Sequence, residues 1–167
     1  LEENASEVVE FAKMCKNLGV DIAQIKPYSQ NPHSMKQFSL NYDGFKEIEE
    51  KLNYLSDDRF KVKYRSVRAE RLCGEREYNK CHGLSFFAII NERGNVAPCH
   101  DFYDIADFSY GNIYEQKFSD IWTGEKRQEI LKRIDKIGFQ ECKRGCRLDL
   151  VNRDLEKVVK RIMKLLD

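Results

Sequence analysis

Four cysteines in the second half of this sequence are spaced like the ligands of a metal site. Cys81 and Cys99 flank a predicted hairpin, while Cys142 and Cys146 enclose a short loop that contains Gly145. The glycine allows the backbone to turn so that both sulfur atoms of this loop face one centre. Four converging thiolates suit a tetrahedral zinc ion or a four-iron cluster, and the spacing does not distinguish between these two sites.

Two alternatives to metal binding stay open for the same cysteines. Unpaired cysteine is among the most buried residue types, so the thiols could simply pack in a core. A disulfide is less favoured, because the cytosol keeps thiols reduced and a bridge between Cys142 and Cys146 would close a strained loop.

The other cysteines and the histidines next to the candidate ligands have different expected roles. Cys15 falls on the apolar face of a predicted helix, where we expect it to pack. Cys73 lies in a polar segment before the hairpin and is assigned to no site, although it could reach the same centre. His82 and His100 each follow a candidate ligand directly. Adjacent strand residues point to opposite faces, so we expect these histidines to support the site rather than to ligate it.

The first part of the chain predicts alternating helices and strands. Residues 3–18 and a segment capped by Asp43 have helical periodicity, whereas residues 20–25 and 60–65 are strand-like. This order is typical of parallel α/β packing. We expect a boundary in the polar stretch that follows, which divides the chain into domains 1–67 and 68–167.

The second part predicts a hairpin followed by helices. Residues 84–90 and 96–99 are expected to be strands joined by a turn at 91–95. Residues 119–122 predict a helical turn, and Thr123 is expected to cap the next helix. A final helix should pack through an apolar face that comprises Val151, Leu155, Val158, Val159, Ile162, Leu165 and Leu166.

The bulk composition argues against several classes of function. The 29 basic and 28 acidic side chains leave a formal net charge of +1, whereas nucleic-acid-binding proteins usually have a clear basic excess. The sequence has neither a long apolar run nor a signal-peptide pattern, so we predict a cytoplasmic protein that does not cross a membrane. Because the chain starts at Leu1 and stops inside an amphipathic pattern, we expect it to be part of a longer protein.

Five segments carry a resemblance to a known family: Cys81, Gly94 to Cys99, Gly111 to Glu115, Phe118 to Trp122, and Cys142 to Arg147. From Cys81 to about Arg153, the chain resembles the auxiliary-cluster region of radical S-adenosylmethionine (SAM) enzymes. This region is called the SPASM domain or, in its shortened form, the twitch domain. A full SPASM domain has more cysteines near its end and binds two auxiliary clusters. The chain is therefore more similar to the single-cluster twitch form.

The resemblance implies a fold of the α/β (α+β) class. Residues 1–67 would be the terminal helix–strand units of a partial (β/α)6 radical SAM barrel. Residues 68–167 would form a twitch-type β-hairpin with helices around one auxiliary [4Fe-4S] cluster, held by the four candidate cysteines. The barrel's C-x3-C-x2-C motif is absent, since Asp149 stands where a third cysteine would follow Cys142 and Cys146. We expect SAM and a second [4Fe-4S] cluster to bind in a missing N-terminal part, and the present segment to be inactive alone.

The resemblance also implies a function. In such enzymes a 5′-deoxyadenosyl radical abstracts hydrogen from the substrate, while the auxiliary cluster transfers an electron or positions the substrate. The expected partners are a small-molecule or peptide substrate and an electron donor such as flavodoxin or ferredoxin. The single-cluster form favours the small molecule. A structural four-cysteine zinc site in an interaction module is the alternative function, and no residue is assigned a catalytic role.

Overall fold

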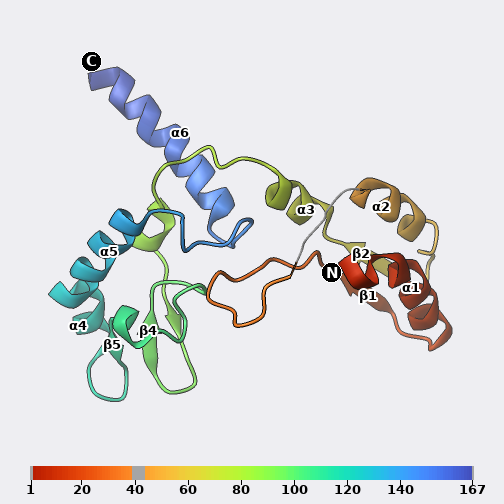
Figure 1. The fold of residues 1–167 in the computed structure, drawn as a ribbon, viewed down its shortest axis with the longest axis horizontal. Coiled ribbons are helices and arrows are strands. Elements are labelled where there is room, and N and C mark those ends of the chain that lie inside the picture. Colours follow the sequence, from red (N-terminus) through yellow and green to blue (C-terminus); the bar gives the residue numbers. More distant parts are fainter. Residues whose placement is uncertain (1, 39–43, 167) are drawn as a thin grey trace. The chain divides into compact units, whose positions relative to one another are not determined.

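The protein divides into two compact units (Figure 1). The computed structural model describes residues 2–38 and 44–166. Unit 1 comprises residues 1–30 and 34–75, and unit 2 comprises residues 31–33 and 76–167. The predicted helix cap Asp43 lies outside the described residues. The assignment of domain identities on either side of residue 67 stays a prediction.

Unit 1 combines helices with a two-stranded parallel sheet. Strands β1 and β2 pair in parallel, with Ala23 opposite Val62, so the predicted parallel helix–strand packing is confirmed. Two strands do not close a barrel, and membership of a radical SAM barrel stays a prediction. The elements in chain order are η1 (Glu2–Glu7, a 3-10 helix), α1 (Val8–Asn17), β1 (Ile22–Ile25), α2 (Phe45–Asn53), β2 (Lys61–Tyr64) and α3 (Ser66–Cys73).

Helix α3 occupies the start of the polar stretch in which the sequence predicts the domain boundary, and no helix was predicted there. Its inner face buries Ala69 and Leu72, while Val67 and Glu70 face solvent. Two buried apolar residues among charged neighbours are too few to give a periodic signal in the sequence. Cys73 is the last residue of this helix and is exposed.

An acidic residue joins helix α1 to the turn before β2. The Asp57 carboxylate lies 2.6 Å from Lys16 Nζ and accepts hydrogen bonds of 2.9 Å from the backbone N–H groups of Arg59 and Phe60. The bond with Lys16, followed by the two backbone bonds, lowers the pKa of Asp57 to about 2 from an ordinary value of 3.8. The folded state therefore favours the ionised carboxylate.

This pKa shift predicts acid-sensitive stability in unit 1. Asp57 should stabilise the fold fully above about pH 4, and this contribution should disappear as the pH falls from 3.8 to about 2. The protection of the Arg59 and Phe60 amides against hydrogen exchange, measured in the full chain, should fall over this range. Asp57→Asn should remove most of that pH dependence. An equally steep profile in this variant would contradict the prediction.

Unit 2 contains a three-stranded antiparallel sheet with the order β3-β4-β5. Its strands are β3 (Ile89–Ile90), β4 (Asn95–Ala97) and β5 (Gly111–Asn112). The predicted hairpin is confirmed, but residues 82–85 form a 3-10 helix (η2, His82–Ser85) where a strand was expected from residue 84. Strand β5 was not predicted, because two residues are too few to show an alternating pattern.

Three helices complete unit 2: α4 (Phe118–Thr123), α5 (Glu125–Ile137) and α6 (Asp149–Leu166). The expectation that Thr123 caps α5 is wrong. Thr123 ends α4, where its hydroxyl donates a 2.9 Å bond to the Ser119 carbonyl, and Gly124 separates the two helices. Nine buried side chains form the core of this unit: Leu84, Val96, Phe102, Phe108, Tyr110, Ile121, Ile130, Ile134 and Leu148.

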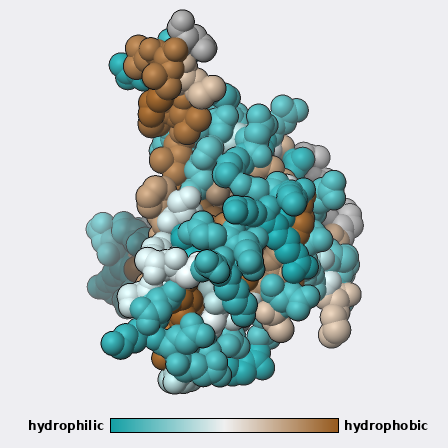
Figure 2. All heavy atoms as spheres, turned by 90° about the vertical axis from the view of Figure 1, so that its left-hand side faces the viewer, coloured by the Kyte–Doolittle hydropathy of each residue, from teal (hydrophilic) through white to brown (hydrophobic). Residues whose placement is uncertain are grey.

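Helix α6 buries a different face from the one that the sequence predicts. Its buried residues are polar, namely Asp149, Asn152 and Glu156. The apolar residues of its second half, including Val158 and Ile162, are exposed. They form the hydrophobic column at the top of Figure 2. Periodicity identified the helix correctly, but polar contacts decided which face packs.

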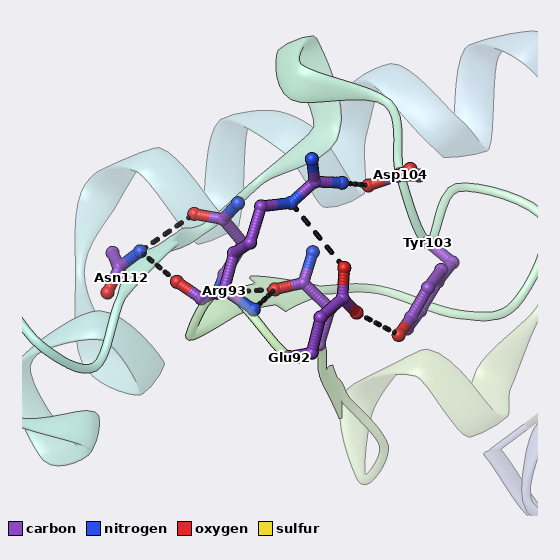
Figure 3. A network of polar contacts seen from close by, with 7 residues as sticks. Glu92, Arg93, Tyr103, Asp104 and Asn112 are labelled. Carbon is purple, nitrogen blue, oxygen red and sulfur yellow. Dashed lines mark hydrogen bonds and ion pairs between the residues drawn. The ribbon is translucent and has the colours of Figure 1, made fainter.

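The β3–β4 turn is held by polar contacts between neighbouring loops (Figure 3). Asn112 donates to the Arg93 carbonyl at 2.8 Å, Arg93 pairs with Asp104, and the Tyr103 hydroxyl donates to Glu92 at 2.9 Å. Gly94 completes the turn with φ of 78°, in the left-handed region. Because glycine has no Cβ atom, its backbone can approach the Tyr114 ring closely.

Replacing Gly94 should destabilise the sheet. A Cβ atom there would lie 2.6 Å from Tyr114 Cδ2 and 2.8 Å from Asn112 Oδ1, and the positive φ adds backbone strain. We expect Gly94→Ala to lower the free energy of unfolding by about 1–2 kcal/mol, measured by urea denaturation. Tyr114 is exposed, so Tyr114→Ala alone should cost little and should recover part of the loss in the double variant. Purely additive effects would exclude the steric explanation.

Candidate metal centre

The four candidate ligands lie on three segments of unit 2. Cys81 directly precedes η2, Cys99 follows β4, and Cys142 and Cys146 lie in the loop between α5 and α6. All four thiols are free and half-buried. Cys81, Cys99 and Cys146 pack against the core of the unit. The fold thus brings together segments that are far apart in the sequence.

The thiols are near enough to affect one another electrostatically. Burial raises the pKa of Cys81, and negative charge on Cys146 raises it further. Burial likewise raises the pKa of Cys99 to about 11, with a smaller contribution from Cys81. A hydrogen bond with Cys142 lowers the pKa of Cys146 to about 7 and raises that of Cys142. Electrostatic influence on the pKa values therefore links Cys142 to Cys146, Cys146 to Cys81, and Cys81 to Cys99.

A buried carboxylate ties the Cys99 segment to the C-terminal cysteine loop. Asp101 is 4% exposed, and its Oδ2 accepts a 2.9 Å bond from the backbone N–H of Lys143. The Lys143 ammonium lies 3.3 Å from Asp101 Oδ1, which compensates the buried charge. Because Asp101 is two residues after Cys99 and Lys143 follows Cys142, these contacts hold the two candidate ligands near each other.

The loop itself is shaped by a glycine and an arginine. Gly145 has φ of 59°, so the predicted turn between Cys142 and Cys146 is confirmed. Arg76 donates a 2.7 Å bond to the Cys142 carbonyl, and its guanidinium lies 4.5 Å from the Phe139 ring centroid. These contacts satisfy a carbonyl that the tight loop leaves without a helical partner.

Helix α6 holds the remaining ligand segment. Asn152 is 1% exposed and donates from Nδ2 to Cys81 Sγ at 3.3 Å. Tyr78, three residues before Cys81, donates its hydroxyl hydrogen to Asp149 at 2.9 Å. Asp101, Arg76 and Asn152 were not identified from the sequence, because each acts through a partner more than 40 residues away that no local pattern indicates.

The other cysteines and the histidines take different positions. His82 Nε2 lies 2.9 Å from Glu156 of α6, which fits the expected supporting role. Burial, followed by the charges of Lys143 and Arg147, lowers the pKa of His100 and so favours its neutral form. Cys15 is half-buried in α1. Cys73 and Cys81 belong to different units, so a role for Cys73 at this centre stays untested.

Among residues 2–38 and 44–166, no three or more cysteine, histidine, aspartate or glutamate side chains form a group that could hold one metal ion. A four-iron cluster binds each cysteine through a different iron, so its ligand sulfurs stand farther apart than those around one zinc ion. Four half-buried thiols that influence one another's pKa values are compatible with this wider arrangement.

Comparison with known proteins agrees with this interpretation. Residues 81–147 match the SPASM family, described as an iron–sulfur cluster-binding domain, which confirms the resemblance predicted from the sequence. A protein of Pyrococcus furiosus, named as the tungsten-containing aldehyde ferredoxin oxidoreductase cofactor-modifying protein, is 28% identical over 145 residues. That alignment covers 75% of this chain and 38% of the relative. No solved structure matches the chain.

Within the described part of the chain, no helix is both long and apolar enough to span a membrane.

Proposed function

Because residues 81–147 match the SPASM family of iron–sulfur cluster-binding domains, we propose that this chain binds one auxiliary [4Fe-4S] cluster. The proposed ligands are Cys81, Cys99, Cys142 and Cys146. The observation that carries the proposal is that all four lie within the matched residues while three separate contacts hold their segments together. A solvated or randomly placed set of thiols would not need these buried polar links.

The proposed role is electron transfer or substrate positioning within a radical SAM enzyme. Four cysteine ligands leave no iron position open for direct substrate coordination, so electron transfer is the favoured role. The half-buried positions of the thiols, beside an aromatic core, limit the access of water to the centre. When bound, the cluster supplies a one-electron redox centre, and the chain's own residues hold it at a defined position.

The substrate and partners remain part of the proposal. A pocket beside Cys81 is lined by Asn79, Lys80, Asp135 and Phe139 together with Cys81, Ile134 and Gly138, and offers a place for a small molecule. The relative's name describes modification of a cofactor, which also favours a small molecule over a peptide. The sequence lacks the C-x3-C-x2-C motif, so SAM cleavage would require a region that carries it. Flavodoxin or ferredoxin would supply electrons.

Metal analysis of anaerobically purified and reconstituted protein tests the proposal. We expect about four iron and four labile sulfide ions per chain and a broad absorbance at ~400 nm that bleaches on reduction. The alternative, a structural zinc site, predicts about one zinc ion per chain and no such absorbance. Stoichiometric zinc after purification, with no iron uptake on reconstitution, would replace the cluster assignment by the zinc assignment.

A further inference from the structure

The buried face of α6 contacts the Cys81 segment through polar side chains. Asp149, Asn152 and Glu156 succeed one another along this face, and each contacts a residue between 78 and 83. Asp149 accepts from Tyr78, and Glu156 pairs with His82. Asn152 lies between them and is the most buried of the three. Its amide makes two contacts, one of them with a sulfur atom.

The orientation of the Asn152 amide follows from its two partners. The backbone N–H of Gly83 donates to Asn152 Oδ1 at 2.8 Å, and a backbone N–H can only donate. The oxygen must therefore face Gly83, and the Nδ2 group must face Cys81 Sγ at 3.3 Å. The two ends of the amide are thereby assigned chemically, without the usual ambiguity between its oxygen and nitrogen.

The backbone at Gly83 packs so closely on α6 that few other arrangements fit between them. Gly83 is buried, and a Cβ atom there would lie 3.1 Å from Leu148 Cδ2 and 3.4 Å from Asn152 Oδ1. The turn after Cys81 therefore packs closely on α6, and the Asn152 amide fills the space between them. Close packing holds the donor N–H group in place relative to the sulfur atom.

We propose that Asn152 is a positioning residue that donates an N–H···S hydrogen bond to Cys81 and raises the reduction potential of the cluster that Cys81 ligates. The inference rests on the proposed function. Reduction adds negative charge that is shared by the ligand sulfurs, and a donor hydrogen bond stabilises this charge. Loss of the bond should therefore make the cluster harder to reduce.

Two variants of Asn152 distinguish loss of the hydrogen bond from the other consequences of replacing this residue. Asn152→Leu removes the donor without adding charge, while Asn152→Asp removes the donor but keeps an acceptor for Gly83. Both should bind the wild-type amount of iron and show a more negative midpoint potential in an EPR-monitored redox titration. Glu156→Gln, one turn away on the same face, is the control: it removes a negative charge and leaves the donor in place. Its potential should rise or stay unchanged.

The outcomes distinguish the inference from the proposed function. If wild-type protein takes up no iron, the cluster assignment fails and the inference fails with it. If Asn152→Leu takes up full iron with an unchanged potential, only the inference fails. Should both Asn152 variants lose iron, pulsed EPR of reduced wild-type protein with ¹⁵N-labelled asparagine decides. A ¹⁵N coupling to the cluster supports the hydrogen bond, and absence of the coupling overturns it.

Discussion

Cys99→Ala should lose most of the bound iron and unfold more readily in unit 2. Cys99 is separated from the end of β4 by Pro98, and Asp101 connects its segment to the loop that carries Cys142 and Cys146. Removing one of four thiolates leaves an incomplete ligand set, so we expect iron content to fall at least about fourfold after reconstitution. Stabilisation by a bound cluster disappears with it, because a ligand that binds only the folded state stabilises that state.

Two matched variants serve as controls for Cys99→Ala. Cys15→Ala removes a half-buried thiol from helix α1 in unit 1, and Cys73→Ala removes an exposed one from the end of α3. Cys15→Ala should keep the wild-type iron content. Cys73→Ala decides whether this cysteine takes part, since a loss of iron there would add it to the ligands. Full iron in Cys99→Ala would contradict the assignment of Cys99.

Arg127→Ala should cause the largest loss of stability in unit 2 that arises from removing a single polar side chain. Arg127 is 6% exposed, and its guanidinium lies 3.7 Å from the Trp122 ring centroid. It also donates to the carbonyls of Ser85 at 3.1 Å and Trp122 at 3.3 Å. The side chain thereby fastens η2, which begins directly after Cys81, to the start of α5.

Truncation at Arg127 leaves these carbonyls without their donor and removes the stacking on Trp122. Buried groups that lose a charged partner destabilise proteins strongly, so we expect the free energy of unfolding to fall by about 2–4 kcal/mol. Arg133→Ala is the control on the same helix. Arg133 is exposed and its guanidinium stacks on the Phe108 ring at 4.4 Å, so its loss should cost less than about 1 kcal/mol. Equal effects of both substitutions in urea denaturation would argue against the structural role of Arg127.

The sequence by itself determined the candidate ligands and the main elements. Cysteine spacing identified Cys81, Cys99, Cys142 and Cys146, and the glycine between the last two correctly predicted a turn. The similarity of residues 81–147 to the SPASM family was also recognisable from local motifs. Periodicity located α1, α2, α5 and α6, because long amphipathic helices repeat the same pattern over several turns. Short elements such as η2 and β5 were missed, since they offer too few residues for a pattern.

The tertiary structure alone decided which side chains position the cysteines. Asp101, Arg76 and Asn152 contact partners more than 40 residues away in the chain. The tertiary structure also decided which face of α6 is buried. Periodicity indicated the apolar side, whereas the structure buries the polar one. A hydrogen bond between distant residues depends on how the chain folds back on itself. Local sequence encodes the identity of each partner but not their proximity.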